Sequence, residues 1–173
     1  MGRRQPEARQ RLQEAALELF EEHGYRNTTA AGIAARAGVT ERTFFRHFPD
    51  KRDVLVVDHQ RLQQRLLEAA DSQPDGLSPL AVATAALEAV AGLLDQHRDR
   101  QARRSRIIRE TPELSERELT KMAAWGAALA DRLRERGVPA ADAGLAAAVA
   151  IATFISTYQR WDHEPAACLV TLL

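Results

Sequence analysis

Apolar residues along the chain recur with the period of an α-helix. Near the N-terminus, Leu12, Ala15, Ala16, Leu19 and Phe20 follow the i, i+3, i+4, i+7 spacing that places them on one helical face. A glycine follows shortly after this stretch, as is typical of a helix end. The same spacing returns in later segments, and the alternation typical of β-strands is absent from the sequence. The pattern therefore predicts an all-α fold.

Residues 28–48 combine two short helical segments around a glycine. Thr29 and Thr40 are each placed to cap a short helix that follows them. Gly38 lies between the two segments, where a glycine easily supplies the positive φ of a tight turn. Two short helices that cross around such a turn form a helix-turn-helix, which places its second helix in the major groove of DNA.

The rest of the sequence predicts longer helices separated by turn-forming residues. Pro49 and Asp50 indicate a turn and the start of a helix that continues to about residue 70, and residues 71–79 form the clearest linker. The last long helix, over about 139–161, is apolar on two faces. A helix that is apolar all round is buried on all sides, which in so small a chain favours a subunit interface. We therefore predict that this helix and residues 165–173 form a dimer interface, with contacts from Leu145, Val149, Ala152, Trp161 and Leu169.

Composition limits the classes of protein that this chain can represent. Its 173 residues carry 24 Lys and Arg against 24 Asp and Glu, so the formal net charge is zero. Residues 1–52 hold 10 basic and 7 acidic residues, a net of +3, and residues 53–173 hold 14 and 17, a net of −3. A single cysteine, Cys168, excludes an intramolecular disulfide and a thiolate metal cluster. The longest uncharged run, 143–159, is interpreted as a buried helix, and the charged N-terminus does not resemble a signal peptide, so we expect a cytoplasmic protein.

The second short helix carries the candidate chemistry. Phe44 and Phe48 lie four residues apart and are expected to face the core, which places Arg42 and Arg46 on the opposite face, flanked by Thr43 and Phe45. Guanidinium and hydroxyl groups are suited to base edges and phosphates in a major groove. The alternative interpretation is that Arg42 and Arg46 are ordinary solvated surface residues. Further phosphate contacts are expected from Lys51, at the start of the next helix, from Thr28 and Thr29 at a helix N-terminus, and from Arg3 and Arg4, which precede the first helix and follow the backbone or enter a minor groove.

Residues 9–55 resemble the DNA-binding domain of the tetracycline-repressor (TetR) family. The residues that carry the resemblance are Ala16, Phe20, Gly24-Tyr25, Thr28-Thr29, Ile33-Ala34, Ala37-Gly38-Val39-Thr40, Thr43-Phe44-Phe45, His47-Phe48 and Lys51. The resemblance implies an all-α homodimer with an N-terminal three-helix head (1–52) and a C-terminal helical ligand-binding and dimerisation domain (53–173). It also implies phosphate contacts from Thr29, Phe45, His47 and Lys51. Phe45 stands where the family often has tyrosine, so the phenolic hydroxyl to phosphate is missing. The full set of predicted DNA contacts is Arg3, Arg4, Thr28, Thr29, Thr40, Arg42, Thr43, Phe45, Arg46, His47 and Lys51.

The C-terminal region offers candidates for an effector site. Apolar side chains at helical spacing are core residues by default, but pockets for small molecules lie between helices and use the same residues. The candidates for a pocket are Leu87, Leu94, Met122, Trp125, Leu129, Phe154 and Tyr158. The arginine-rich stretch from Arg98 to Arg109 has three interpretations: a solvated helix face, a site for an anionic head group, or a DNA contact.

No arrangement of residues in the sequence predicts catalysis, a metal site or a cofactor. The five histidines are scattered, and no glycine-rich phosphate loop is present. The sequence therefore predicts a ligand-responsive dimeric repressor that leaves a palindromic operator when an apolar or amphipathic effector binds. The alternative is a helical small-molecule binding module with a weak or vestigial DNA-binding head.

Overall fold

A computed structural model describes residues 4–55, 59–164 and 166–173, with the side chains of residues 4–6 and 59 outside that description. Helices account for all the regular secondary structure in this described part of the chain. The internal contacts divide the chain into two compact units, Met1–Val57 with Arg103–Glu118, and Asp58–Ala102 with Leu119–Leu173. The prediction of an all-α fold is confirmed.

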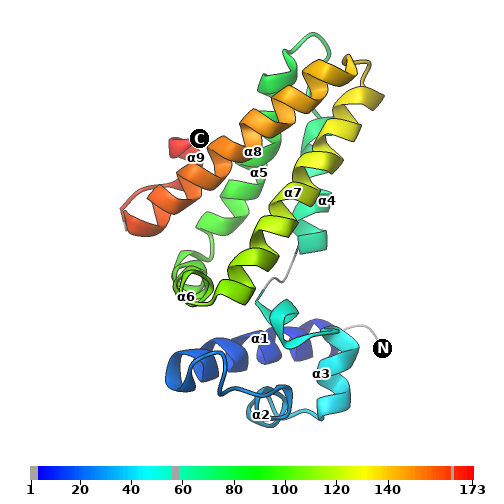
Figure 1. Cartoon of the computed structure of the whole chain (residues 1–173). Helices are drawn as coiled ribbons and strands as arrows, with labels where there is room; N and C mark the ends of the chain where they lie inside the picture. The colour runs from blue at the N-terminus through cyan, green and yellow to red at the C-terminus, as the bar shows by residue number, and fades with distance from the viewer. Residues whose placement is uncertain (1–3, 56–58, 165) are drawn as a thin grey trace. The chain divides into compact units, whose positions relative to one another are not determined.

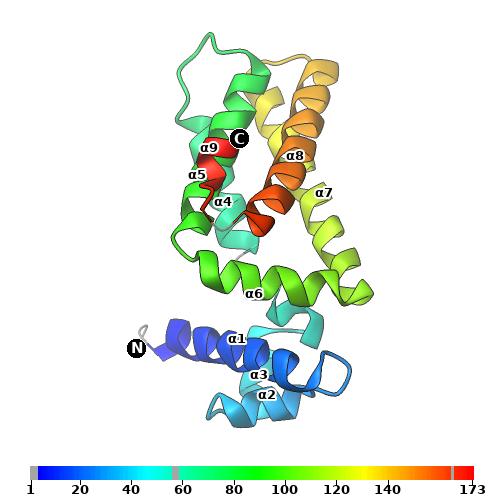
Figure 2. The same ribbon diagram turned by 90° about the vertical axis from the view of Figure 1, so that its left-hand side faces the viewer.

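The first unit is built on α1 (Arg4–His23), α2 (Ala30–Arg36) and α3 (Glu41–His47), followed by the short 3₁₀ helix η1 (Lys51–Val54). Figures 1 and 2 show α1, α2 and α3 packed together. The unit also contains the second half of α6 (Arg98–Arg109) and the start of α7 (Pro112–Glu135). Its core combines apolar side chains from these elements, including Leu12, Ala16, Phe20, Ile33, Phe44, Phe48, Ile107 and Leu114.

The helix-turn-helix has the caps that the sequence predicts. The Thr29 hydroxyl accepts a hydrogen bond from the Gly32 backbone N–H at 3.0 Å, and the Thr40 hydroxyl accepts one from the Thr43 N–H at 3.2 Å. Each satisfies a backbone donor that the first turn of a helix otherwise leaves without a partner. Gly38 has φ +67°, the left-handed conformation that a side chain strains. These local contacts set the start and the orientation of α3.

Removing the Thr40 cap is expected to lower the free energy of unfolding. The substitution Thr40→Ala leaves the α3 N-terminus without its side-chain acceptor, and we expect a loss of about 1 kcal/mol in a chemical denaturation experiment. Thr153→Ala is the matched control, because Thr153 lies exposed inside a helix and only donates to the Val149 carbonyl. A Thr40→Ala protein as stable as the Thr153→Ala protein would contradict the assigned role of the cap.

The helix predicted to run from the Pro49–Asp50 turn to about residue 70 is not continuous. Its first part is η1, capped by the Asp50 carboxylate, and α4 (His59–Asp71) begins further along the chain. The two parts serve different cores, since Val54 and Leu55 are buried in the first unit and Leu66 in the second. The continuous apolar pattern of the sequence therefore does not show that its first part packs in one hydrophobic core and its second part in another.

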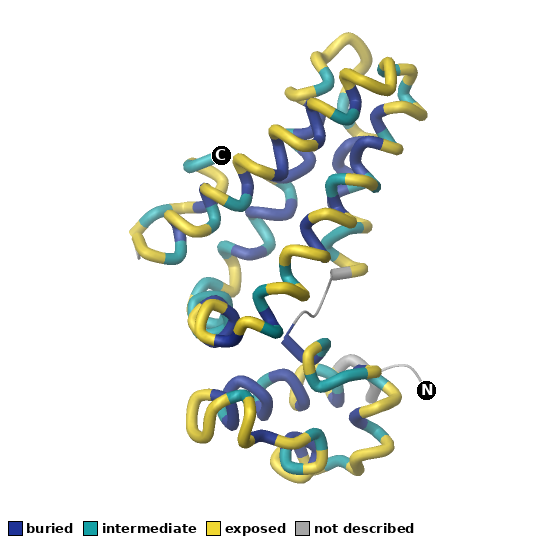
Figure 3. Tube along the Cα trace, viewed as in Figure 1, coloured by how far each residue is buried: buried dark blue, intermediate teal, exposed yellow. Residues whose placement is uncertain are grey.

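The second unit contains α4, α5 (Pro79–Asp95), most of α7, α8 (Ala140–His163) and α9 (Leu169–Leu172). The predicted cap of α5 is confirmed, with the Ser78 hydroxyl accepting from the Ala81 N–H. Figure 3 shows buried positions lining the inward faces of these helices. By length and composition, α8 is apolar enough to cross a membrane. We interpret it as a core helix, because it packs against α5 and buries Ala147, Ile151 and Phe154.

Candidate nucleic-acid interface and effector core

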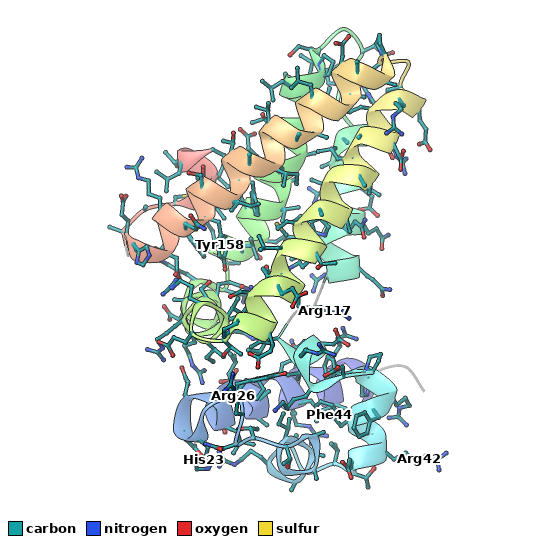
Figure 4. The ribbon with its side chains drawn as sticks, viewed as in Figure 1. His23, Arg26, Arg42, Phe44, Arg117 and Tyr158 are labelled. Atoms are coloured by element: carbon teal, nitrogen blue, oxygen red, sulfur yellow. The ribbon has the colours of Figure 1, made fainter. Side chains whose placement is uncertain are left out.

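The two faces of α3 are divided as the sequence predicts. Phe44 and Phe48 are 0% and 1% exposed, and their ring centroids lie 5.5 Å apart in the core of the first unit. Arg42 and Arg46 are exposed, and the Phe45 ring between them is 49% exposed. Figure 4 shows Arg42 extending away from the helix while Phe44 lies inside. A buried aromatic pair therefore anchors a helix whose outer face presents two guanidinium groups and one aromatic ring.

The exposed arginines of α3 differ from neighbouring arginines in their charge partners. On α2, Arg36 contacts Glu18 at 3.0 Å and Glu22 at 2.8 Å, and Arg52 of η1 contacts Asp50 at 2.6 Å. Within the described part of the chain, neither Arg42 nor Arg46 has a carboxylate at ion-pair distance. Their charges are therefore available to a ligand outside the chain.

The predicted threonine contacts fall into two groups. The exposed Thr29 and Thr40 act as caps, and the Thr40 and Thr43 hydroxyls lie 3.0 Å apart at the start of α3. Thr28 is buried, and its hydroxyl donates to the backbone carbonyls of Leu19 and Gly24. The Thr28 hydroxyl thus fastens the end of α1 to the following loop, which leaves its side chain inside the unit.

Lys51 is tied into the first unit. Its ammonium group donates to the backbone carbonyls of Tyr25 and Thr28, both at 2.8 Å, and lies 4.0 Å from the centroid of the Tyr25 ring. Partial burial lowers the pKa of Lys51. An ammonium group carries three protons, so one donor remains beyond these two bonds. Lys51 therefore orders the loop before α2 in addition to any contact with DNA.

The remaining predicted DNA contacts are His47, Arg3 and Arg4. His47 is half-buried at the end of α3, and its Nε2 atom is buried without a hydrogen-bond partner in the described structure. Burial, followed by the charges of Arg46 and Arg9, lowers the pKa of the His47 imidazole. Arg3 lies outside the described residues, and of Arg4 only the backbone, at the start of α1, is described.

All seven predicted effector residues belong to one hydrophobic core in the second unit. Trp125, Phe154, Tyr158 and Trp161 form a row in which successive ring centroids lie 6.2, 6.2 and 5.3 Å apart, and Figure 4 shows Tyr158 on α8. At one end of the row, the Lys121 ammonium lies 5.3 Å from the Trp125 ring centroid. The residues proposed from the sequence thus lie together in one core, and the cationic groups of Lys121 and Arg98 lie beside its aromatic rings. The seven residues are Leu87, Leu94, Met122, Trp125, Leu129, Phe154 and Tyr158.

The predicted dimer residues separate into exposed and buried positions. Leu145 and Val149 are 65% and 42% exposed, and Ala152 is exposed one turn further along α8. Trp161 and Leu169, by contrast, are 1% and 0% exposed within a single subunit. Their inclusion in the interface set is corrected, because both side chains pack the core of their own unit and offer no surface to a second chain.

The arginine-rich α6 forms contacts that the sequence interpretation did not include. Within the first unit, Arg103 and Arg106 contact the Glu21 carboxylate at 2.7 and 2.6 Å, and Arg104 donates to the Leu55 carbonyl at 2.5 Å. The hydrogen bond from Arg103, followed by the nearby charges, lowers the pKa of Glu21. Within the second unit, Arg98 donates to the carbonyls at the end of α8 and stacks 4.4 Å from the Trp161 ring centroid. These four arginines hold helices together.

A capped helix-turn-helix joined to a separate helical unit with its own apolar core defines a class of protein, the one-component transcriptional regulators. Residues 12–56 match the family described as bacterial regulatory proteins, tetR family, and residues 71–173 match the MftR C-terminal domain. The chain belongs to the TetR family, with a C-terminal domain of the MftR type.

Individual relatives agree with this assignment. MftR of Mycobacterium tuberculosis, named for regulation of mycofactocin biosynthesis, is 28% identical over 179 residues, which cover 100% of this chain and 89% of MftR. The solved SmeT–triclosan complex, with SmeT described as an efflux-pump repressor of Stenotrophomonas maltophilia, has a TM-score of 0.64 at 25% identity. It covers 94% of this chain and 84% of SmeT. Thermus thermophilus FadR, solved with lauroyl-CoA, has a TM-score of 0.52 at 25% identity, over 95% and 88% of the two chains.

Proposed function

We propose that this regulator is a dimeric repressor that reads its operator with α3 and leaves it when an effector enters the second unit. The observation that carries the proposal is the outer face of α3, where Arg42 and Arg46 are exposed and lack carboxylate partners in the described structure. The buried Phe44 and Phe48 hold this face in place, and the Thr40 cap sets its start. Guanidinium groups on a helix held in this way are suited to guanine edges in a major groove.

The aromatic core of the second unit supports an apolar or amphipathic effector. SmeT was solved with triclosan and T. thermophilus FadR with lauroyl-CoA, and both ligands have large apolar parts. The effector shifts the equilibrium only if it binds the DNA-free conformation more tightly than the DNA-bound one. In this proposal the row from Trp125 to Trp161 supplies that differential contact, as core residues that repack around the ligand.

The dimer places two copies of α3 on one operator. A two-fold axis relates the copies, so the operator is palindromic, with half-sites about one helical turn or slightly more apart. The exposed apolar strip of α8, formed by Leu145, Val149 and Ala152, is the proposed contact between subunits. In this proposal the regulator works in the cytoplasm, where its operator lies, and it binds and releases DNA without catalysis.

A selection of DNA ligands tests the proposal. The full chain is incubated with a library of randomised duplexes at about 150 mM salt, where nonspecific binding is weak. We expect enrichment of one palindromic sequence. Failure to enrich any sequence would support the second candidate, a helical small-molecule binding module with a vestigial head. The placement of two exposed arginines on the outer face of α3, opposite its buried aromatic pair, favours the first candidate.

The pH dependence of DNA binding tests the proposed place of His47. In the free protein, burial and the charges of Arg46 and Arg9 favour the neutral imidazole. A DNA phosphate beside the ring favours the protonated form, so binding raises the pKa and affinity increases as pH falls. We expect at least about threefold tighter binding at pH about 6 than at pH about 8, on either side of the ordinary histidine value. Fluorescence anisotropy at constant ionic strength measures the effect, and His47→Gln is expected to abolish it. A His47→Gln protein with the wild-type pH profile would exclude a phosphate contact at this ring.

A further inference from the structure

Arg9, in the second turn of α1, has an environment that folding alone does not explain. Its guanidinium lies over the Phe48 ring, 5.0 Å from the centroid. Its Nε atom is buried and has no hydrogen-bond partner in the described structure. A buried donor without an acceptor destabilises the folded chain, and it does so more strongly when the group is charged. The contact with Phe48 holds the side chain in place but provides no hydrogen-bond acceptor.

Arg9 differs from most of the arginines in the first unit whose side chains the structure describes. Seven of them have a carboxylate within 4 Å among the described residues, and they are Arg26, Arg36, Arg52, Arg103, Arg104, Arg106 and Arg117. No ion pair of this kind is formed by Arg9, Arg11, Arg42 or Arg46 in the part of the chain that the structure describes. Arg9 therefore shares its unpaired state with the two arginines that face the proposed DNA groove.

His47, beside Arg9, also has a buried nitrogen without a hydrogen-bond partner in the described structure. Arg9 packs on Phe48, the residue directly after α3, and the charge of its guanidinium acts on His47, the last residue of that helix. Side chains from α1 and α3 thus lie near the end of α3, each with a nitrogen that has no hydrogen-bond partner in the described structure. An anion is the ligand that complements both of them.

We propose that Arg9 binds a backbone phosphate of the operator, together with His47, beside the groove that α3 enters. The inference rests on the proposed function, because it assigns the anion to DNA. DNA is favoured over a free anion because Arg46, the residue before His47, is exposed on the face of α3 that is proposed to meet DNA. Arg9 then anchors α1 to the DNA backbone and fixes the angle at which α3 enters the groove, without contacting a base.

The salt dependence of binding separates this role from a structural one. Each phosphate contact contributes about 0.9 to the slope of log affinity against log salt concentration, and a dimer has two Arg9 side chains. For Arg9→Gln bound to a random-sequence duplex of about 30 base pairs, we expect the slope to decrease by about 1.8. Arg9→Lys, which keeps the charge but not the planar group over Phe48, is expected to keep the wild-type slope. Circular dichroism melting of each variant monitors the fold.

The matched control is Arg61→Gln, which removes the same charge from an exposed arginine of α4 in the second unit and is expected to leave the slope unchanged. An Arg9→Gln slope equal to that of the wild type overturns the proposal, even if affinity falls, because Arg9 then acts only by packing on Phe48. Equal losses of slope in Arg9→Lys and Arg9→Gln overturn it as well. A wild-type chain that binds no duplex refutes the proposed function itself, whereas a wild-type chain that binds with an unaltered Arg9→Gln slope refutes only the phosphate contact.

Discussion

Replacing Leu145 and Val149 together by glutamate is expected to convert the dimer into monomers and to weaken operator binding by at least about 100-fold. Both side chains are exposed on α8, at 65% and 42%, on a helix whose other face is buried in the core. In a two-fold interface each patch meets its own copy, so the substitutions place four carboxylates in one small contact. A monomer loses the gain in effective concentration that a linked second head provides. Sedimentation velocity and anisotropy titrations measure the two effects.

A glutamate at another exposed leucine serves as the control. Leu119 on α7 is 63% exposed, and Leu119→Glu introduces one charge at an exposed apolar position outside α8. We expect this variant to sediment as a dimer and to bind the operator with wild-type affinity. A Leu145→Glu/Val149→Glu protein that remains dimeric would show that the subunits meet elsewhere.

The local features of the fold were predictable because each depends on residues close in sequence. Thr29 and Thr40 lie next to the helices they cap, and Gly38 lies in the turn that needs its positive φ. The inward direction of Phe44 and Phe48 follows from their spacing of four residues. The N-caps, the turn glycine and the apolar spacing are all local signals, so the sequence alone indicates which face of α3 is exposed.

Features that depend on distant residues were not predictable. Arg103 pairs with Glu14 and Glu21, which lie more than 80 positions away in the sequence. The run of charges in α6 therefore does not indicate these partners. Helical periodicity also indicates that a face is covered but not which chain covers it. Trp161 and Leu169 are covered by their own subunit, whereas the face with Leu145 is exposed in it. Whether an arginine such as Arg9 has a carboxylate partner depends likewise on residues far away in the sequence, and within the described residues Arg9 has none.

Arg42→Ala is expected to remove most of the preference for the operator over random DNA. A bidentate contact from arginine to guanine discriminates against a wrong base by about 1–3 kcal/mol, or about 5- to 150-fold for each subunit. Both subunits of a dimer lose the contact, so the factors multiply for a palindromic site. On random DNA the substitution removes only a charge, because no specific base contact exists there. Arg42 is exposed and free of carboxylate partners in the described structure, so its removal leaves no buried group unpaired.

Arg36→Ala is the matched control for this substitution. Arg36 is an exposed arginine of the same helix-turn-helix, but its guanidinium is held by Glu18 and Glu22. An exposed ion pair contributes about 0–1 kcal/mol, so its removal changes stability little. We expect Arg36→Ala to keep the wild-type preference for the operator. This result would show that the effect of Arg42→Ala comes from the outer face of α3 and not from the loss of any arginine in the helix-turn-helix.

The central claim is that α3 reads base sequence through its exposed face. The most direct test is the ratio of affinities for the selected operator and for a random duplex of equal length, measured by anisotropy at about 150 mM salt for the wild type and for Arg42→Ala. The account predicts that the ratio falls by at least about tenfold in the variant, with most of the loss on the operator. Equal losses on both duplexes, leaving the ratio unchanged, would contradict it.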